Sequence, residues 1–253
     1  MKYTTKILGK KHAFDTTQWA IVRAAPDPKA LDSLIAIYWK PLYFFARQRG
    51  YDNETAKDIT QSFLTALLVR NAFSKADPSR GRFRSFLLAA LENFIKDWTR
   101  GETREKRGGG RPVFSLDFER GEGEFNLESA RGDAPDRVLH RAWARTLWTQ
   151  AFSELEADAP HLEAFRLYLK DASTATIAAR TGLSESGAKS AVHRLKDQLR
   201  RRIVEHLRKT AGSEADLQAD LQDFVELLAE EPLPGPGQGA GAQVQRPRPQ
   251  KSA

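Results

Sequence analysis

Apolar residues recur along most of this chain at spacings of three and four, the repeat that gathers them on one face of an α-helix. Over 28–49 this repeat predicts an amphipathic helix bent at Pro41, and a short helix is expected before it, within 14–25. Further runs predict a third helix over about 52–70 and a fourth over about 82–100. Strand-like alternation is almost absent. The pattern therefore indicates an all-α fold that starts with a four-helix bundle.

The helical pattern breaks at residues 101–133, which are rich in glycine and charge and have no sustained period. Helical spacing resumes near Ala134, so we expect two small all-α domains joined by a flexible linker. An acidic helix is expected near 214–230, and the proline- and glycine-rich end predicts a disordered tail. The expected division is an N-terminal extension at 1–13, a first domain at 14–100, the linker at 101–133, a second domain at 134–209, the acidic helix at 210–231 and the tail at 232–253.

Residues 176–195, TIAARTGLSESGAKSAVHRL, contain two helical runs on either side of a glycine. Gly182 suits the positive φ of a helix-turn-helix, and the small side chains of Ala178 and Ala179 let the two helices cross closely. Ser184 is well placed to cap the second helix, whose basic, exposed face would fit a DNA major groove. An ordinary helical hairpin with a solvated basic face is the alternative. The candidate duplex-binding residues are Ser184, Glu185, Ser186, Lys189, Ser190, His193, Arg194 and Lys196.

The charge balance favours a polyanionic partner, because the formal net charge is +7 and the pI is near 9.6. Such a balance alone does not separate nucleic acid from a membrane surface. Residues 180–209 contain nine Lys or Arg against three acidic residues, a local net charge of +6 that adds weight to DNA. The chain has no cysteine, no signal-peptide pattern and no apolar run of membrane-spanning length. We therefore expect a soluble, cytoplasmic protein without membrane insertion.

Catalytic motifs are scarce. The five histidines show no metal-ligand spacing, and RGGGRP lacks the lysine-serine signature of a phosphate-binding loop. No serine lies in a nucleophile-elbow pattern. The sequence predicts a protein that is not an enzyme and needs no cofactor or metal.

Three segments in a fixed order make the chain resemble bacterial RNA polymerase sigma factors of the small, extracytoplasmic-function type. TIAARTGLSESGAKSAVHRLKDQLR resembles the family's fourth conserved region, which binds the promoter's −35 element. YDNETAKDITQSFLTALL resembles the polymerase-binding helix of the second region, and FRSFLLAALENFIKDWTR resembles the segment that melts and captures the −10 element. The similarity covers about 14–100 and 134–209. It implies core RNA polymerase and promoter DNA as partners, with an anti-sigma factor or other regulatory protein as a possible further one.

The resemblance implies roles for Asp58, Gln61, Phe63, Asn93 and Asp97, and helical spacing, charge and aromatic character add neighbouring residues to them. The candidate polymerase-binding residues are Asp58, Gln61, Phe63 and Thr65, and the candidates for the −10 strand are Asn93, Lys96, Asp97, Trp98, Arg100 and Arg104. A single strand is held by a basic groove with aromatic faces, and residues 82–111 have a net charge of +4. Asn93 could read a base edge, while Trp98 or Phe94 could stack, although Phe94 also fits the core stripe. Glu92 departs from the family, which often has arginine there.

The main interpretation is a sigma factor that directs promoter-specific initiation. The alternatives are a stand-alone helix-turn-helix regulator and, in a third class, a nucleic-acid-processing enzyme. The acidic helix has a net charge of −7 over 214–231. We hypothesise that it packs on the second domain and competes with DNA; a solubilising terminal cap is the alternative.

Overall fold

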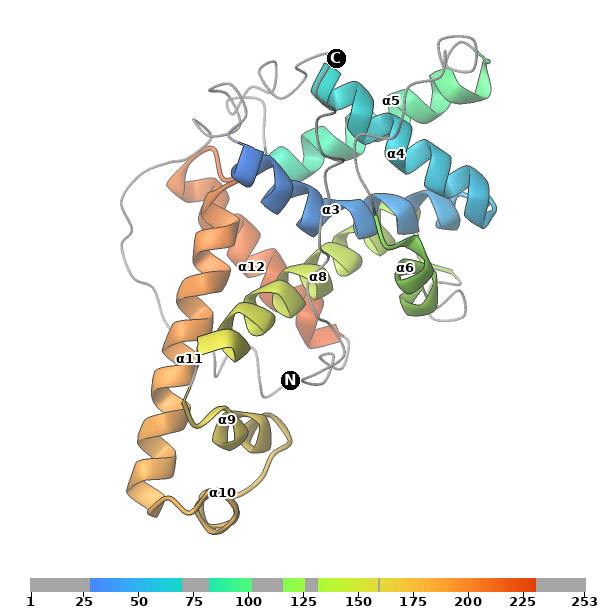
Figure 1. Ribbon diagram of the computed structural model, residues 1–253. Helices are drawn as coiled ribbons and strands as arrows, with labels where there is room; N and C mark the ends of the chain where they lie inside the picture. The colour runs from blue at the N-terminus through green and yellow to red at the C-terminus, as the bar shows by residue number, and fades with distance from the viewer. Residues whose placement is uncertain (1–27, 70–81, 102–115, 126–131, 159, 231–253) are drawn as a thin grey trace, which may run out of the picture.

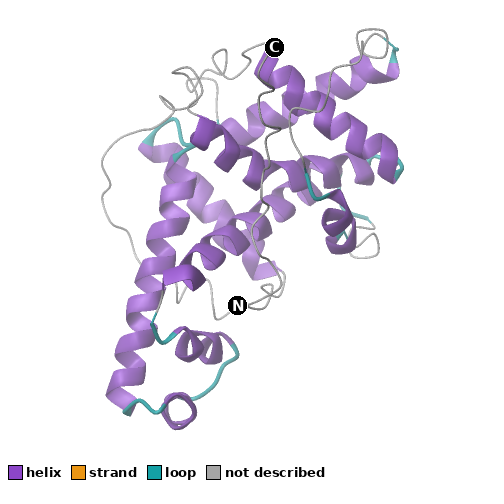
Figure 2. Ribbon diagram, viewed as in Figure 1, coloured by secondary structure: helices purple, strands orange, loops and turns teal. Residues whose placement is uncertain are grey.

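The computed structural model describes residues 28–69, 82–101, 116–125, 132–158 and 160–230, and every regular element in these ranges is an α-helix (Figures 1 and 2). The all-α prediction is confirmed for this part of the chain. The elements in order are α3 (Pro28–Gln48), α4 (Asn53–Val69), α5 (Phe83–Thr99), α6 (Phe118–Glu124), α8 (Pro135–Asp158), α9 (Leu162–Leu169), α10 (Thr174–Thr181), α11 (Glu185–Arg208) and α12 (Glu214–Glu230).

Helices α3, α4 and α5 match three of the four helices predicted for the first domain. Asp52 caps α4, because its Oδ1 accepts a hydrogen bond of 2.7 Å from the backbone N–H of Thr55. Helix α3 continues as one element through Pro41. The helix predicted within 14–25, like the extension at 1–13 and the tail at 232–253, lies outside the described residues.

The first and second parts of the chain meet along α3 and α8, which pack against each other more extensively than any other pair of described helices. Tyr38 and Trp39 of α3 and Trp143 and Leu147 of α8 are at most 3% exposed and belong to one continuous core. The two-domain arrangement on a flexible tether is therefore not confirmed. Within the described residues, the two halves share a core instead.

Helix α6 lies inside the segment that the sequence predicts to be linker, and it packs on α3. Phe118 places its ring edge-on against Trp39 and Tyr43, with centroids 5.3 Å apart in both pairs. Glu122 accepts hydrogen bonds from Tyr43 and from Arg47, whose Nη2 lies 2.8 Å from Glu122 Oε1. Aromatic contacts and ion pairs thus attach this part of the linker to the body of the protein.

Helix α12 has the bounds predicted for the acidic helix, and it packs against α8 and α11. Ser213 starts it by accepting a hydrogen bond from the backbone N–H of Asp216, and Leu217, Phe224 and Leu228 are buried. The expectation that this helix packs on the part of the chain at 134–209 is confirmed by its contacts with α8 and α11; its competition with DNA stays a hypothesis. None of the helices described has the length and apolar character needed to cross a membrane.

Candidate nucleic-acid interface

The turn between α10 and α11 has the geometry that its sequence predicts. Gly182 ends α10 with φ +69°, in the left-handed region that favours glycine. Ser173 caps α10 by accepting a hydrogen bond from the N–H of Thr176, and Ser184 caps α11 through the N–H of Gly187, both at 3.1 Å. Three local signals therefore define the start and end of α10 and the start of α11.

Helix α11 separates an apolar stripe from a polar face. The stripe is at most 8% exposed at Ala188, Ala191, Val192, Leu195 and Leu199. Seven of the eight candidate duplex-binding residues are exposed, and Lys196 is half-buried: Ser184, Glu185, Ser186, Lys189, Ser190, His193, Arg194 and Lys196. The structure thus brings these residues together on one helix, with their side chains available for contact.

The N-terminal half of α11 projects from the body together with α9 and α10, as Figure 1 shows. Helix α11 has 24 residues, which corresponds to a length of about 36 Å at the standard helical rise. Its C-terminal half packs in the body of the protein, while its first turns lie at the far end of the projection. A projecting helix of this kind has the shape with which helix-turn-helix proteins enter a major groove.

A pocket of about 310 Å³ lies between α9, α10 and α11 at this projecting end. Lys189, His193 and Lys196 line it, together with Tyr168 and Ser173. The Lys196 ammonium lies 5.5 Å from the centre of the Tyr168 ring, which orients this cation beside the pocket. Sequence reasoning missed Tyr168 and Ser173, because they precede the glycine turn and are brought to α11 by the fold.

Four of the candidates for the −10 strand lie on one exposed face of α5 and its C-terminal end, but Trp98 is buried. Asn93, Lys96, Asp97 and Arg100 are exposed and follow one another at intervals of three, one and three residues. Trp98 is only 5% exposed, and its ring lies 5.9 Å from that of Phe94. The expectation that Trp98 offers a stacking surface is therefore wrong for this structure, because the indole belongs to the core. Arg104 lies outside the described residues.

Glu92, the departure from the family beside Asn93, is paired. Its Oε1 lies 2.6 Å from Nη2 of Arg49, which comes from the end of α3. Both side chains are near 40% exposed, at 42% for Arg49 and 38% for Glu92. The arginine therefore offsets the negative charge next to Asn93.

The candidate polymerase-binding residues on α4 include three that reach the surface and one that is buried. Asp58 is exposed, and Gln61 and Thr65 are half-buried on the outer side of the helix. Phe63 is 2% exposed and packs against Phe94 of α5 at 5.5 Å between ring centroids. Phe63 therefore lies in the core, and its expected place on a polymerase-binding face is corrected.

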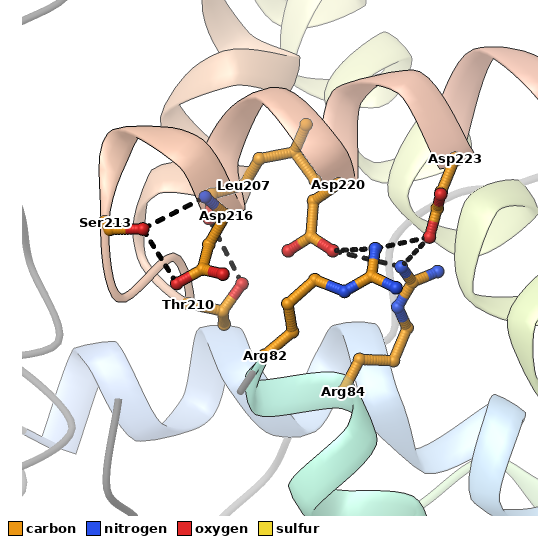
Figure 3. A network of polar contacts seen from close by, with 8 residues as sticks. All are labelled: Arg82, Arg84, Leu207, Thr210, Ser213, Asp216, Asp220 and Asp223. Carbon is orange, nitrogen blue, oxygen red and sulfur yellow. Dashed lines mark hydrogen bonds and ion pairs between the residues drawn. The ribbon is translucent and has the colours of Figure 1, made fainter. Parts of the chain in front are cut away.

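Two of the basic residues within 82–111, the segment expected to contact the −10 strand, form ion pairs with the acidic helix α12 (Figure 3). Arg82 and Arg84, at the start of α5, both pair with Asp220 and Asp223 of α12, at distances from 2.5 to 3.3 Å. Arg84 is 1% exposed, and its guanidinium carbon lies 3.9 Å from the centre of the Trp143 ring. No local sequence pattern reveals this contact, since its partners are more than 130 residues apart.

The environment of this cluster affects its ionisable groups unequally. Burial raises the pKa of Asp220, although the nearby Arg84 and Arg82 oppose that shift. At the more exposed Asp223 burial also opposes ionisation, but hydrogen bonds and charge from Arg82 and Arg84 outweigh it and lower the pKa. Burial, followed by the charge of Arg84, lowers the pKa of His140 to about 4, so this imidazole is neutral near pH 7.

Two further observations bear on the site. Among the described residues, no group of His, Asp or Glu side chains is arranged to hold a metal ion. No family model, curated protein or solved structure matches this chain.

Proposed function

We propose that this chain is a sigma-type transcription initiation subunit, which binds core RNA polymerase in the cytosol and directs it to promoters. In this proposal α11 reads the −35 duplex, the outer face of α5 contacts the −10 strand, and α4 docks on the polymerase. The observation that carries it is the projecting α10–α11 pair, whose candidate DNA-binding side chains are exposed or half-buried on one face. The projecting helix pair by itself suggests only DNA binding. The resemblance of the α4 and α5 segments to sigma factors is the reason to propose core polymerase as a second partner.

The test is run-off transcription from a genomic library with purified core polymerase. The proposal expects discrete transcripts that depend on the added chain; core polymerase that starts at no site with the chain present would refute it. Asp58→Ala should weaken co-purification with the core at least about fivefold, the effect of an interface residue that contributes more than ~1 kcal/mol. Glu119→Ala, which removes another exposed carboxylate, from α6, is the matched control and should bind the core as the parent does.

The duplex-reading role has its own test. Arg194→Ala removes an exposed cation from the projecting part of α11, so promoter affinity should fall and the slope of log affinity against log salt should decrease by ~0.9. Arg137→Ala, on the exposed N-terminal turn of α8, removes the same charge from the body of the protein. Equal salt slopes for the two variants would mean that α11 makes no phosphate contact through Arg194.

One observation favours a second candidate, a stand-alone helix-turn-helix regulator. The core shared by α3 and α8 holds the two halves together, whereas a sigma factor must reach two separated promoter elements. A regulator would bind duplex sites tightly without polymerase, and Asp58→Ala would leave its DNA binding and its output unchanged. Transcripts that require both the chain and its Asp58 would exclude this candidate.

A further inference from the structure

The start of α5 and the middle of α8 form a cluster of two arginines and a tryptophan, and α12 covers it. Arg82 Nη1 donates hydrogen bonds to Asp223 at 2.5 Å and to Asp220 at 3.3 Å. Arg84 Nη2 donates to the same two carboxylates at 2.7 and 3.0 Å (Figure 3). We refer to Arg82, Arg84 and Trp143 as the arginine–tryptophan cluster.

The tryptophan of the cluster is covered by the same helix. Phe224 of α12 lies edge-on to Trp143, with centroids 6.1 Å apart and an interplanar angle of 87°. Trp143 also lies against the Arg84 guanidinium, 3.9 Å from the ring centre to the guanidinium carbon. One turn of α12 thus offers two carboxylates to the arginines and one aromatic ring to the indole.

The carboxylates leave part of the cluster unsatisfied. Arg84 is 1% exposed, yet its Nε and Nη1 have no hydrogen-bond partner among the described residues. An unpaired buried donor is costly, and a buried ion pair is often no more stable than an apolar replacement. Stability alone therefore does not account for the buried guanidinium group of Arg84 beside the partly exposed one of Arg82. A ligand richer in acceptor oxygens than the carboxylates would satisfy them better.

The chemistry of the cluster matches that of a single-stranded nucleic acid. Guanidinium groups bind phosphate oxygens through paired hydrogen bonds, and an indole face stacks on a base of any sequence. A strand that replaced α12 could place phosphate oxygens where the two Asp carboxylates now lie, and a base could pack on Trp143 in the space where Phe224 now lies edge-on. The outer part of the contact is open to solvent, since the side chains of Arg82 and Asp223 are 29% and 33% exposed.

We propose that the arginine–tryptophan cluster is a binding site for single-stranded DNA, and that α12 occupies it as an internal competitor until a strand displaces it. This rests on the proposed function only in assigning DNA as the ligand. Leu217, Phe224 and Leu228 are buried against the body, so the free chain keeps α12 in place. Strand binding then requires α12 to leave. In this way α12 competes with DNA at the arginine–tryptophan cluster, not by covering the exposed face of α11.

The test is the affinity of the full chain for a short fluorescein-labelled oligothymidylate, measured by fluorescence anisotropy without polymerase. Asp220→Asn combined with Asp223→Asn weakens the competitor, and the affinity should rise about tenfold, equivalent to ~1.4 kcal/mol. Glu214→Gln combined with Glu226→Gln makes the same change in net charge on the same helix, away from the cluster. This control pair should change the affinity about twofold or less. Equal gains for both pairs would overturn the proposal.

The arginines supply the second comparison. Adding Arg82→Ala to the Asp220→Asn/Asp223→Asn variant should remove most of the gain, because it removes the more accessible cation of the cluster. A gain that persists in this triple variant would mean that the strand binds elsewhere. Oligouridylate and inorganic phosphate, measured beside the oligothymidylate, distinguish DNA from RNA and from a free anion; tighter binding of either one would overturn the assignment to DNA.

A measurement on the unaltered protein covers the case in which the Asn variants fail to fold. Saturating oligothymidylate should increase amide hydrogen exchange over 214–230, because the strand releases α12. Unchanged or slower exchange there, with the oligonucleotide bound, would overturn the proposal. The transcription assay is independent of both readouts. If the chain binds the strand in this manner but supports no initiation, the proposed function is refuted and the binding site stands. If the chain supports initiation but does not bind the strand in this manner, only the binding site is refuted.

Discussion

The guanidinium carbon of Arg84 lies 3.9 Å from the centre of the Trp143 ring, which places a buried cation between an indole and the carboxylates of Asp220 and Asp223. Three helices that are distant in the sequence meet at this contact: α5 brings the arginine, α8 the tryptophan and α12 the two acids. The state of this contact therefore reports whether α12 is attached to the rest of the protein.

Replacing Arg84 should be far more damaging than replacing an exposed arginine in a similar ion pair. Arg84→Met keeps most of the packing on Trp143 but leaves Asp220, whose side chain is 3% exposed, with a weaker set of partners. We expect the free energy of unfolding to fall by about 3 kcal/mol, measured by urea denaturation. Arg49→Met breaks the exposed pair with Glu92 and should cost less than about 1 kcal/mol. Similar losses for the two variants would show that Arg84 is not stabilised by its buried partners.

The neutral state of His140 should make the protein sensitive to mild acid. Burial and Arg84 hold the folded pKa of His140 at about 4, against an ordinary histidine pKa of 6.5. A histidine with a lowered pKa contributes stability above about pH 6.5 and loses it as the pH falls toward 4. Because the ring is only partly buried, we expect a loss of about 2 kcal/mol from this group.

The measurement is the free energy of unfolding at a series of pH values for the parent and for His140→Asn. The variant should lack this part of the decline between about pH 6.5 and pH 4, while carboxylate titration affects both proteins alike. His161→Asn, at an exposed position with positive φ that asparagine tolerates, is the control and should follow the parent curve. Parallel curves for the parent and His140→Asn would contradict the assignment.

The parts of the fold that the sequence predicts well are those governed by neighbouring residues. Ser173, Gly182 and Ser184 act within one turn of their own position, so both ends of α10 and the start of α11 follow from local chemistry. The apolar spacing of α4 and the acidic helix α12 likewise predicts both elements.

The predictions that the structure does not bear out concern contacts between residues far apart in the sequence. Residues 116–125 are predicted to be linker because glycine and charge hide the helical pattern of α6, whose packing of Phe118 on Trp39 is a tertiary contact. The family resemblance predicts Phe63 on a binding face, and the need for a stacking ring predicts Trp98 there, although apolar spacing puts both rings in the core. The pairing of Arg84 with α12 depends on tertiary contacts that no local pattern contains.

The attachment of α6 to α3 can be tested with two glycines in the same helix. A Cβ at position 121 would lie 3.0 Å from two ring carbons of Trp39, and that indole is fully buried. Gly121→Ala should therefore lower the free energy of unfolding by about 1–3 kcal/mol, the range for overpacking a filled core. Gly123→Ala meets no atom within 4 Å and should be neutral or slightly stabilising. Equal effects in urea denaturation would mean that α6 is not packed on Trp39.

Ser184 combines a structural role with a proposed DNA contact, and three substitutions separate the two. Its Oγ accepts the hydrogen bond from the N–H of Gly187 that caps α11, so Ser184→Ala should cost about 1 kcal/mol of stability. Ser184→Asn and Ser184→Asp both retain a capping oxygen, and both should unfold close to the parent in urea.

Only the Asp variant adds a negative charge at the N-terminal end of α11, which lies next to DNA in the proposed function. Its affinity for a promoter duplex should fall several-fold below that of Ser184→Asn at low salt, and the difference should shrink as salt screens the repulsion between carboxylate and phosphate. The two variants share a cap and nearly the same volume, so helix stability cannot produce this difference. Identical affinities for Ser184→Asn and Ser184→Asp across the salt series would mean that the first turn of α11 lies away from the phosphates, and the reading helix would then have to be sought elsewhere in the chain.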